Sequence, residues 1–189
     1  MVFDHETPKR QRAIGRKTIG IFGEINESTT AAIIPELIEE EFERDNIKEL
    51  HIYICSEGGF LSHCFAIIDF LLMLKERFGV MIYTYALGEI ASGGFFLFLL
   101  GDKRMLYPSC RIFVHEHITT NEEPKTYSTR IKEDKTSEKA LYEMYLAYTS
   151  TQLGTTKRRA KTLLAMNKWL SKKDIKQYNI LGDKDDQAK

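Results

Sequence analysis

Cysteine is scarce in this sequence. Among 189 residues there are only three cysteines, Cys55, Cys64 and Cys110, and none belongs to a C-x-x-C pair. An odd number of cysteines without paired spacing suggests neither a disulfide framework nor a standard zinc site. We therefore expect a protein of a reducing compartment, the cytoplasm, that uses no metal and no other cofactor.

Net charge and long apolar runs are missing too. The 27 basic residues balance the 27 acidic ones, which argues against a dedicated nucleic-acid binder. The longest apolar run, Phe95 to Leu100, is far shorter than the roughly 20 residues that cross a bilayer. The polar N-terminus has no apolar signal-peptide core. We expect neither nucleic acid nor a membrane among the partners.

Proline and glycine are infrequent, with 4 and 12 residues, while 43% of the chain is hydrophobic and 29% is charged. This composition is that of a globular protein and excludes wholesale disorder. At about 150 residues per domain, the length fits one domain with appendages.

Predicted strands and helices alternate along the chain. We expect a helix capped by Asn26 or Ser28 that carries apolar residues as far as Phe42 and that Pro35 turns or kinks. A long helix, largely polar in its first half, is expected over 127–153 and should project into solvent or pack on another subunit. The remaining pattern predicts strands at 18–22, 49–55, 81–86 and 111–115, and helices at 60–77 and 92–100. Such alternation indicates an α/β fold with parallel, right-handed crossovers.

Three of these strands end in segments with chemical potential: Ser56 to Gly59, Ala91 to Gly94, and His115 to His117. The carboxyl ends of parallel strands share one edge of a sheet, so these segments can converge on one crevice. Two histidines on one strand face could bind a metal, but no matching ligand cluster with zinc spacing accompanies them.

Ser92 and His115 form a candidate nucleophile and base. A serine at the start of a helix has free backbone N–H groups beside it that can stabilise an oxyanion, and a histidine within reach can take its proton. Each residue alone has a simpler explanation, since serine commonly caps helices and an isolated histidine is commonly structural. The sequence around Ser92 also lacks the first glycine of the G-x-S-x-G elbow of α/β-hydrolases.

The order of the segments carries a family resemblance. Read in sequence, IYICSEGGFLSHCFAIIDFLLMLK, ALGEIASGGFFLFLLGDKRMLYPSCRIFVHEH and WLSKKDIKQYNILGD resemble the ClpP family, the proteolytic subunits of ATP-dependent Clp proteases, from about Thr18 to Asp183. Members carry a strand ending in S-P-G-G, a central A-A-S-M-G, a strand that begins after proline and ends in histidine, and a late F-[LM]-S segment that ends in G-L-[IV]-D. Pro108, Arg111 and His115 match the third of these elements.

The resemblance implies a fold, an activity and partners. It implies a ClpP/crotonase-like spiral of βαβ units with a protruding handle helix at about 125–153, within one protease domain over 18–183. Residues 1–17 would be a flexible N-terminal segment and 184–189 a C-terminal tail. It implies a serine endopeptidase that cuts peptides or unfolded proteins inside a homo-oligomer of stacked seven-membered rings, with an ATP-dependent unfoldase as partner. The implied site residues are the nucleophile Ser92, the general base His115, and the oxyanion-hole amides of Gly59 and Gly93.

One departure from the family concerns the third catalytic position. Members have an aspartate two residues before the aromatic of the last segment, and here that place before Trp169 is held by Asn167. An asparagine can orient a histidine but cannot stabilise imidazolium by charge, so we expect reduced activity. Asp174 or an acid from a neighbouring subunit are alternatives for the third role.

Two other functions stay open. One is a catalytically weak or inactive ring subunit with a regulatory or structural role, which the Asn167 substitution favours. The other is a crotonase-like acyl-thioester enzyme, which would need neither Ser92 nor His115.

Overall fold

The computed structural model describes residues 14–37, 39–115 and 131–182, and a six-stranded sheet forms their centre. Its strands run in the spatial order β1-β2-β3-β5-β6, with β4 also pairing with β3. Every pairing is parallel except that between β5 and β6. The strands are β1 (Gly15–Ile25), β2 (Ile47–Gly59), β3 (Met81–Ala91), β4 (Lys103–Leu106), β5 (Arg111–Val114) and β6 (Lys168–Trp169). The expected α/β fold is confirmed.

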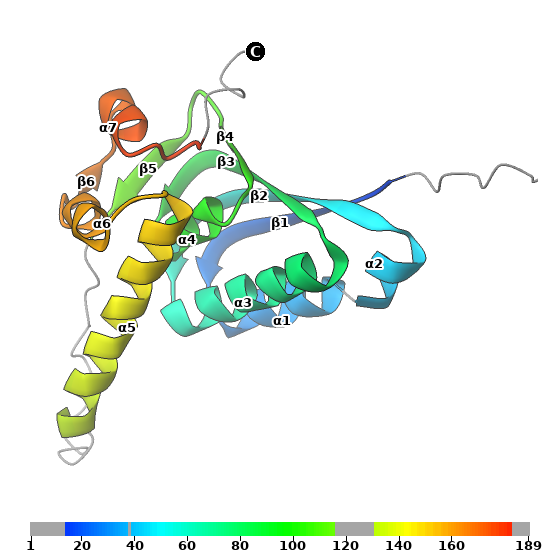
Figure 1. The fold of residues 1–189 in the computed structure, drawn as a ribbon, viewed down its shortest axis with the longest axis horizontal. Helices are drawn as coiled ribbons and strands as arrows, with labels where there is room; N and C mark the ends of the chain where they lie inside the picture. The colour runs from blue at the N-terminus through cyan, green and yellow to red at the C-terminus, as the bar shows by residue number, and fades with distance from the viewer. Residues whose placement is uncertain (1–13, 38, 116–130, 183–189) are drawn as a thin grey trace, which may run out of the picture.

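Helices connect the strands and cover the sheet unevenly (Figure 1). Helices α1 and α3 lie along one face, and α5 extends away from the body of the molecule (Figure 1). The helices are α1 (Glu27–Glu36), α2 (Glu39–Arg44), α3 (Leu61–Phe78), α4 (Gly93–Leu99), α5 (Ile131–Gln152), α6 (Lys157–Leu164) and α7 (Lys172–Gln177). The first part of the expected handle range, 125–130, lies outside the described residues, and α5 accounts for most of the rest.

The two faces of strand β2 have different roles. Leu50, Ile52 and Ile54 are completely or almost completely buried in the core, as the alternation along this segment predicts. The opposite face carries His51 and Tyr53, whose rings stack on tyrosines of β3 with centroid distances of 4.5 Å in each case. Alternate side chains of one strand therefore build the core and an aromatic layer on the other side of the sheet.

The helical segment after β1 differs from the single helix that was expected. Asn26 caps α1 as predicted, because its side chain accepts the N–H of Thr29. The helix nevertheless ends at Glu36, and a separate helix, α2, follows. Pro35 lies in the last turn, where the N–H of Leu37 bonds to the carbonyl of Ile34. Proline has no N–H to donate within the helix and its ring crowds the preceding turn, which disrupts helices, and α1 ends one residue after Pro35.

Other boundaries also differ from the expectation. Strand β1 starts at Gly15, before the expected Thr18, and β3 continues to Ala91, five residues past the expected end. The short strands β4 and β6 and the helix α6 have no counterpart in the sequence analysis. Residues 1–13 and 183–189, which include the expected tail, lie outside the described residues.

Arg104, on β4, ties three distant parts of the chain together. Its guanidinium donates hydrogen bonds to the carbonyl oxygens of Gly101, Gln152 and Ile180 at 2.9, 2.7 and 3.2 Å. The side chain is almost fully buried, and burial lowers its pKa. Three acceptors around one buried cation satisfy groups that would otherwise be costly to desolvate.

No helix in the described ranges is both long and apolar enough to cross a membrane.

Candidate active site

Ser92 stands at the junction of β3 and α4 in an unusual backbone conformation. Its φ is +47° and its ψ is −119°, a region that residues other than glycine seldom occupy. Ser92 is the N-cap residue of α4, but its side chain makes no capping hydrogen bond. The hydroxyl is therefore not used as a helix cap, and the strained backbone is of the kind found at functional sites.

Two glycines allow the start of α4 to pack against its surroundings. A Cβ on Gly94 would lie 2.6 Å from the carbonyl oxygen of Ser56, and a Cβ on Gly93 would lie 3.3 Å from the side chain of Ile25. The thiol of Cys64 donates to the carbonyl of Gly93 at 3.2 Å. The first turn of α4 is thus held between β1, β2 and α3, with Ser92 at its tip.

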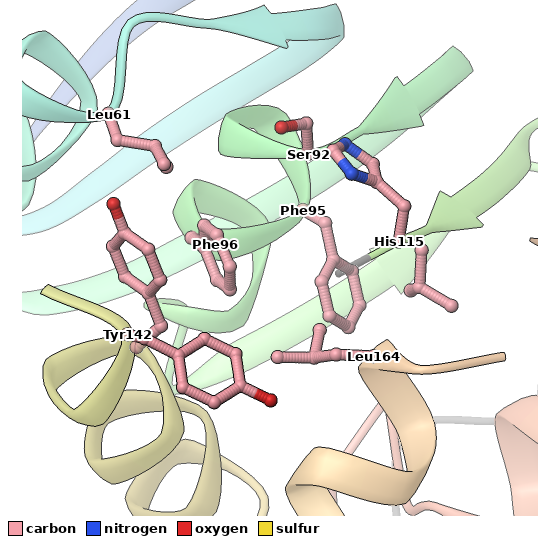
Figure 2. Close-up of a pocket in the computed structure, with 9 residues that line it drawn as sticks. Leu61, Ser92, Phe95, Phe96, His115, Tyr142 and Leu164 are labelled. Atoms are coloured by element: carbon pink, nitrogen blue, oxygen red, sulfur yellow. The ribbon is translucent and has the colours of Figure 1, made fainter. Parts of the chain in front are cut away.

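His115 follows the last residue of β5 and lines the same pocket as Ser92. In Figure 2 the imidazole ring lies beside the Ser92 side chain. Both residues are partly buried. The strand ends at Ala91 and Val114 thus bring together two residues that are 23 positions apart in the sequence, as the convergence of parallel strands predicts.

The rest of the pocket is apolar and aromatic. It encloses about 380 Å³, including the part that opens to solvent, and its lining comes from four helices and the end of β5. Tyr142 and Tyr145 come from α5, and the phenol of Tyr148 ties that helix to α4 through a 2.9 Å hydrogen bond to the carbonyl of Phe96. Besides Ser92 and His115, the lining residues are Leu61, Phe95, Phe96, Val114, Tyr142, Tyr145 and Leu164.

Asn167 directly precedes β6, and His115 directly follows β5. Val114 pairs with Lys168 at the end of this antiparallel ladder, so His115 and Asn167 are the residues that adjoin its last pair. Asn167 has φ +46°, and the extended strand begins after it. The rings of Phe113 and Trp169, the pair one step earlier, are in contact with centroids 5.1 Å apart.

The two glycines that end β2 have separate contacts. Gly58 (φ +101°) lies against Ser92, because a Cβ there would be 2.6 Å from the Ser92 Cβ and 2.8 Å from the Gly93 nitrogen. Gly59 (φ +149°) lies against β1, where a Cβ would be 2.2 Å from the Ile25 carbonyl oxygen. Neither position can hold a larger residue without a shift of backbone, and both positive φ values require glycine.

Asp174, the alternative acid, is engaged elsewhere. Its carboxylate accepts the N–H and the hydroxyl of Ser171 at 2.8 and 2.6 Å, in the capping box of α7. It also pairs with Lys168 at 3.0 Å. These hydrogen bonds, those of Ser171 first, lower its pKa to about 2. The carboxylate therefore serves the helix cap.

The three cysteines differ in burial. Cys64 is fully buried, and burial raises the pKa of its thiol. Cys55 and Cys110 are only partly buried. No three His, Cys, Asp or Glu side chains of the described part of the chain gather as they would around a metal ion. His117 lies outside the described residues.

Sequence reasoning missed most of the pocket wall. It named neither Leu61 nor the tyrosines of α5, and it did not predict α6, which supplies Leu164. A signal existed for the tyrosines, because Tyr142, Tyr145 and Tyr148 recur at a spacing of three on a helix that is otherwise largely polar.

The family follows from comparison of the whole chain with known protein families. Residues 5–183 match the family described as Clp protease. The match spans nearly the whole sequence and includes every element that lines the pocket. The chain therefore belongs to the Clp protease family, whose members are peptidases.

Proposed function

We propose that this chain is a serine endopeptidase in which Ser92 attacks the scissile carbonyl, His115 is the general base and Asn167 orients the imidazole. The amides of Gly59 and Gly93 would form the oxyanion hole. The observation that carries the proposal is that Ser92 and His115 line one pocket, with the serine at a strained strand-to-helix junction and its hydroxyl free of capping.

Backbone geometry supports the choice of Gly59 as one oxyanion donor. The N–H of Phe60 bonds to the carbonyl of Ile25 at 2.8 Å, toward β1. Ile25 pairs with Gly59 in the parallel ladder, where the partner strand is bonded by the residues on either side of Gly59, so the N–H of Gly59 itself is directed away from β1. Gly93 offers the second amide as the first residue of α4, where helical N–H groups have no partner within the helix.

The chemistry would proceed in two stages. The imidazole of His115 takes the proton as the Ser92 oxygen bonds to the carbonyl carbon, and the oxyanion that forms accepts hydrogen bonds from the two amides. The imidazolium then gives its proton to the leaving amine as the peptide C–N bond breaks, which leaves an acyl-enzyme. Water deprotonated by His115 releases the acid and restores Ser92.

The pocket wall supports an apolar substrate side chain next to the scissile bond. Its seven residues other than Ser92 and His115 are aliphatic or aromatic. A charged side chain would lose its hydration there without gaining an opposite charge, whereas an apolar one would gain about 25 cal/mol for each Å² removed from water.

Asn167 would limit the rate. In a triad, loss of the charged third member leaves the geometry intact but typically lowers turnover by about 10⁴. An active but slow enzyme is the expected result.

Labelling with a fluorophosphonate probe tests the proposal. The probe should label the folded, assembled wild type at Ser92, and the Ser92→Ala variant should not react. His115→Ala should slow labelling strongly, whereas heat-denatured wild type should show none. A folded, assembled wild type that does not react with the probe would contradict the proposal.

A second candidate is supported by Asn167 alone: a weakly active or inactive subunit that joins an active paralogue in mixed rings. Native mass spectrometry of complexes from the source cells separates the two. A partner paralogue at fixed stoichiometry favours the second candidate, and a homo-oligomer with probe-reactive Ser92 favours the first.

Assembly and location complete the proposal. Family membership implies oligomeric assembly in general. We propose seven-membered rings in the cytoplasm, joined through the α5 region as handle, with an ATP-dependent unfoldase as partner. Electron microscopy of the purified protein would count the subunits of a ring.

A further inference from the structure

The buried side chain of Ser56 contacts the glycine turn beside Ser92, formed by Gly58 and Gly59. Ser56 is only 2% exposed. Its hydroxyl oxygen accepts the N–H of Gly58 at 3.0 Å, and this bond is buried. Since Gly58 touches Ser92 and the Gly93 nitrogen, one hydrogen bond connects Ser56 to the turn that faces the nucleophile.

Two hydrogen bonds hold the residues on either side of Gly59, whose amide is a proposed oxyanion donor. On its N-terminal side, Gly58 is held by the Ser56 hydroxyl; on its C-terminal side, Phe60 is held by the Ile25 carbonyl at 2.8 Å. Gly58 and Gly59 both have positive φ and no side chain, so they restrain their own backbone less than other residues would. The two flanking hydrogen bonds therefore restrain the peptide between them, in addition to the pairing of Gly58 and Gly59 with β1.

Ser56 also contacts the helix that carries the nucleophile. Its carbonyl oxygen and Cβ lie 2.6 and 3.2 Å from the place that a Cβ on Gly94 would occupy. Ser56 is thus packed between the glycine turn and α4. A change at this residue acts on the distance between the turn and the nucleophile.

We propose that Ser56 is a positioning residue, which through its hydroxyl holds the Gly58–Gly59 turn so that the Gly59 amide meets the oxyanion. This inference rests on the proposed function. An oxyanion donor acts fully only near 2.7–3.1 Å from the oxygen, and misplacement by 1 Å can cost about 100-fold in rate. The Ser56 hydroxyl should therefore affect the transition state much more than the binding of substrate.

Ser56→Ala tests this inference. We expect kcat on a fluorogenic peptide to fall by about 10- to 100-fold while KM changes by less than about twofold. The matched control is Thr156→Ala, which removes another hydroxyl that accepts a backbone N–H, that of Arg159 in α6. It should leave kcat unchanged. Equal kcat losses in the two variants, or an unchanged kcat in Ser56→Ala, would overturn the inference.

A pair of inhibitors separates positioning from general destabilisation. The Ser92 oxygen adds to the carbonyl carbon of a peptide aldehyde, and the resulting oxyanion is bound by the amides of Gly59 and Gly93. The matching peptide alcohol has no such carbonyl and only fills the pocket. In Ser56→Ala the dissociation constant of the aldehyde should rise by the factor lost in kcat/KM, and that of the alcohol should stay the same. A parallel rise for both compounds would contradict a role at the oxyanion.

Conservative variants cover the case in which alanine disturbs folding. Ser56→Thr keeps the hydroxyl and should retain most of kcat, and Ser56→Cys, with a weaker acceptor, should give an intermediate value. If Ser56→Thr and Ser56→Ala lost the same activity while both proteins were folded and assembled, the inference would be overturned. A wild type that is neither labelled by the fluorophosphonate nor able to bind the aldehyde would instead refute the proposed function, and this inference with it.

Discussion

Val114 pairs with Lys168 at the end of the antiparallel ladder of β5 and β6, and the residues that adjoin this pair are His115 and Asn167. Asn167 was chosen from the sequence only by its distance from an aromatic residue. The ladder gives an independent physical reason for the same choice, because the pair at its end joins the neighbour of His115 to the neighbour of Asn167.

Restoring a carboxylate at this position should raise the rate. Asn167→Asp should increase kcat by roughly 10- to 1,000-fold, since a charged third member stabilises the imidazolium that forms during attack. Steady-state hydrolysis of a fluorogenic peptide measures the change. Asn179→Asp is a matched control, because Asn179 also has a positive φ, +51°, in the turn after α7, and it should leave kcat unchanged. An equal kcat in Asn167→Asp and wild type would argue against a role for residue 167.

Gly58→Ala should remove nearly all activity. Its Cβ would lie 2.6 Å from the Ser92 Cβ at a backbone φ of +101°, so the turn must move away from the nucleophile. We expect kcat/KM to fall by more than about 100-fold. Gly79→Ala is the control: Gly79 has φ +62° and open space around it. That variant should cost about 1 kcal/mol of stability but keep kcat/KM. Similar kcat/KM values for both variants would show that contact with Ser92 is unimportant.

A charge on the pocket wall should change the substrate preference. Leu61 is half-buried at the start of α3 and lines the pocket. Leu61→Lys should lower kcat/KM for peptides with an apolar residue before the scissile bond by about 10- to 100-fold and raise it for peptides with glutamate there. Leu72→Lys places the same charge on an exposed site of the same helix and should change neither. A peptide panel with one varied residue measures the preference; an unaltered preference in Leu61→Lys would exclude this wall as the specificity site.

Stability in acid should depend on Asp174. Its folded pKa, about 2, is below the ordinary value of 3.8, so the ionised carboxylate stabilises the fold above about pH 4 and this contribution is lost as the pH falls toward 2. We expect the Tm of wild type to exceed that of Asp174→Asn at pH 7. The two Tm values should converge as the pH falls toward 2. Asp69→Asn, at an exposed site on α3, is the control. A constant difference between wild type and Asp174→Asn across this range would contradict the assignment.

Local patterns predicted the elements that surround the nucleophile. The alternation of Leu50, Ile52 and Ile54 identified β2, which ends in the glycine pair beside Ser92, and the apolar run after Ser92 identified α4. Each of these elements buries its apolar residues with the regular spacing of a strand or a helix. The chain order of these elements then placed Ser92 and His115 at one sheet edge, where the structure has them in one pocket.

Features set by tertiary contacts could not be predicted in this way. Strand β6 has two residues, too few for a pattern, and exists because it pairs with β5. The hydrogen bond from Gly58 to Ser56 depends on backbone angles that a glycine pair permits but does not specify. The pocket wall from α5 and α6 depends on how helices distant in the sequence pack on α4.

A single side chain, that of Arg104, couples the end of α5 to the segment that follows α7. Its guanidinium donates to carbonyl oxygens of residues 3, 48 and 76 positions away in the sequence. Displacement of any one of these carbonyls deprives a buried cation of part of its hydrogen bonding, which is costly. Local opening around Ile180 should therefore loosen the attachment of the α5 end to β4, so that the two regions exchange their amide hydrogens as one unit.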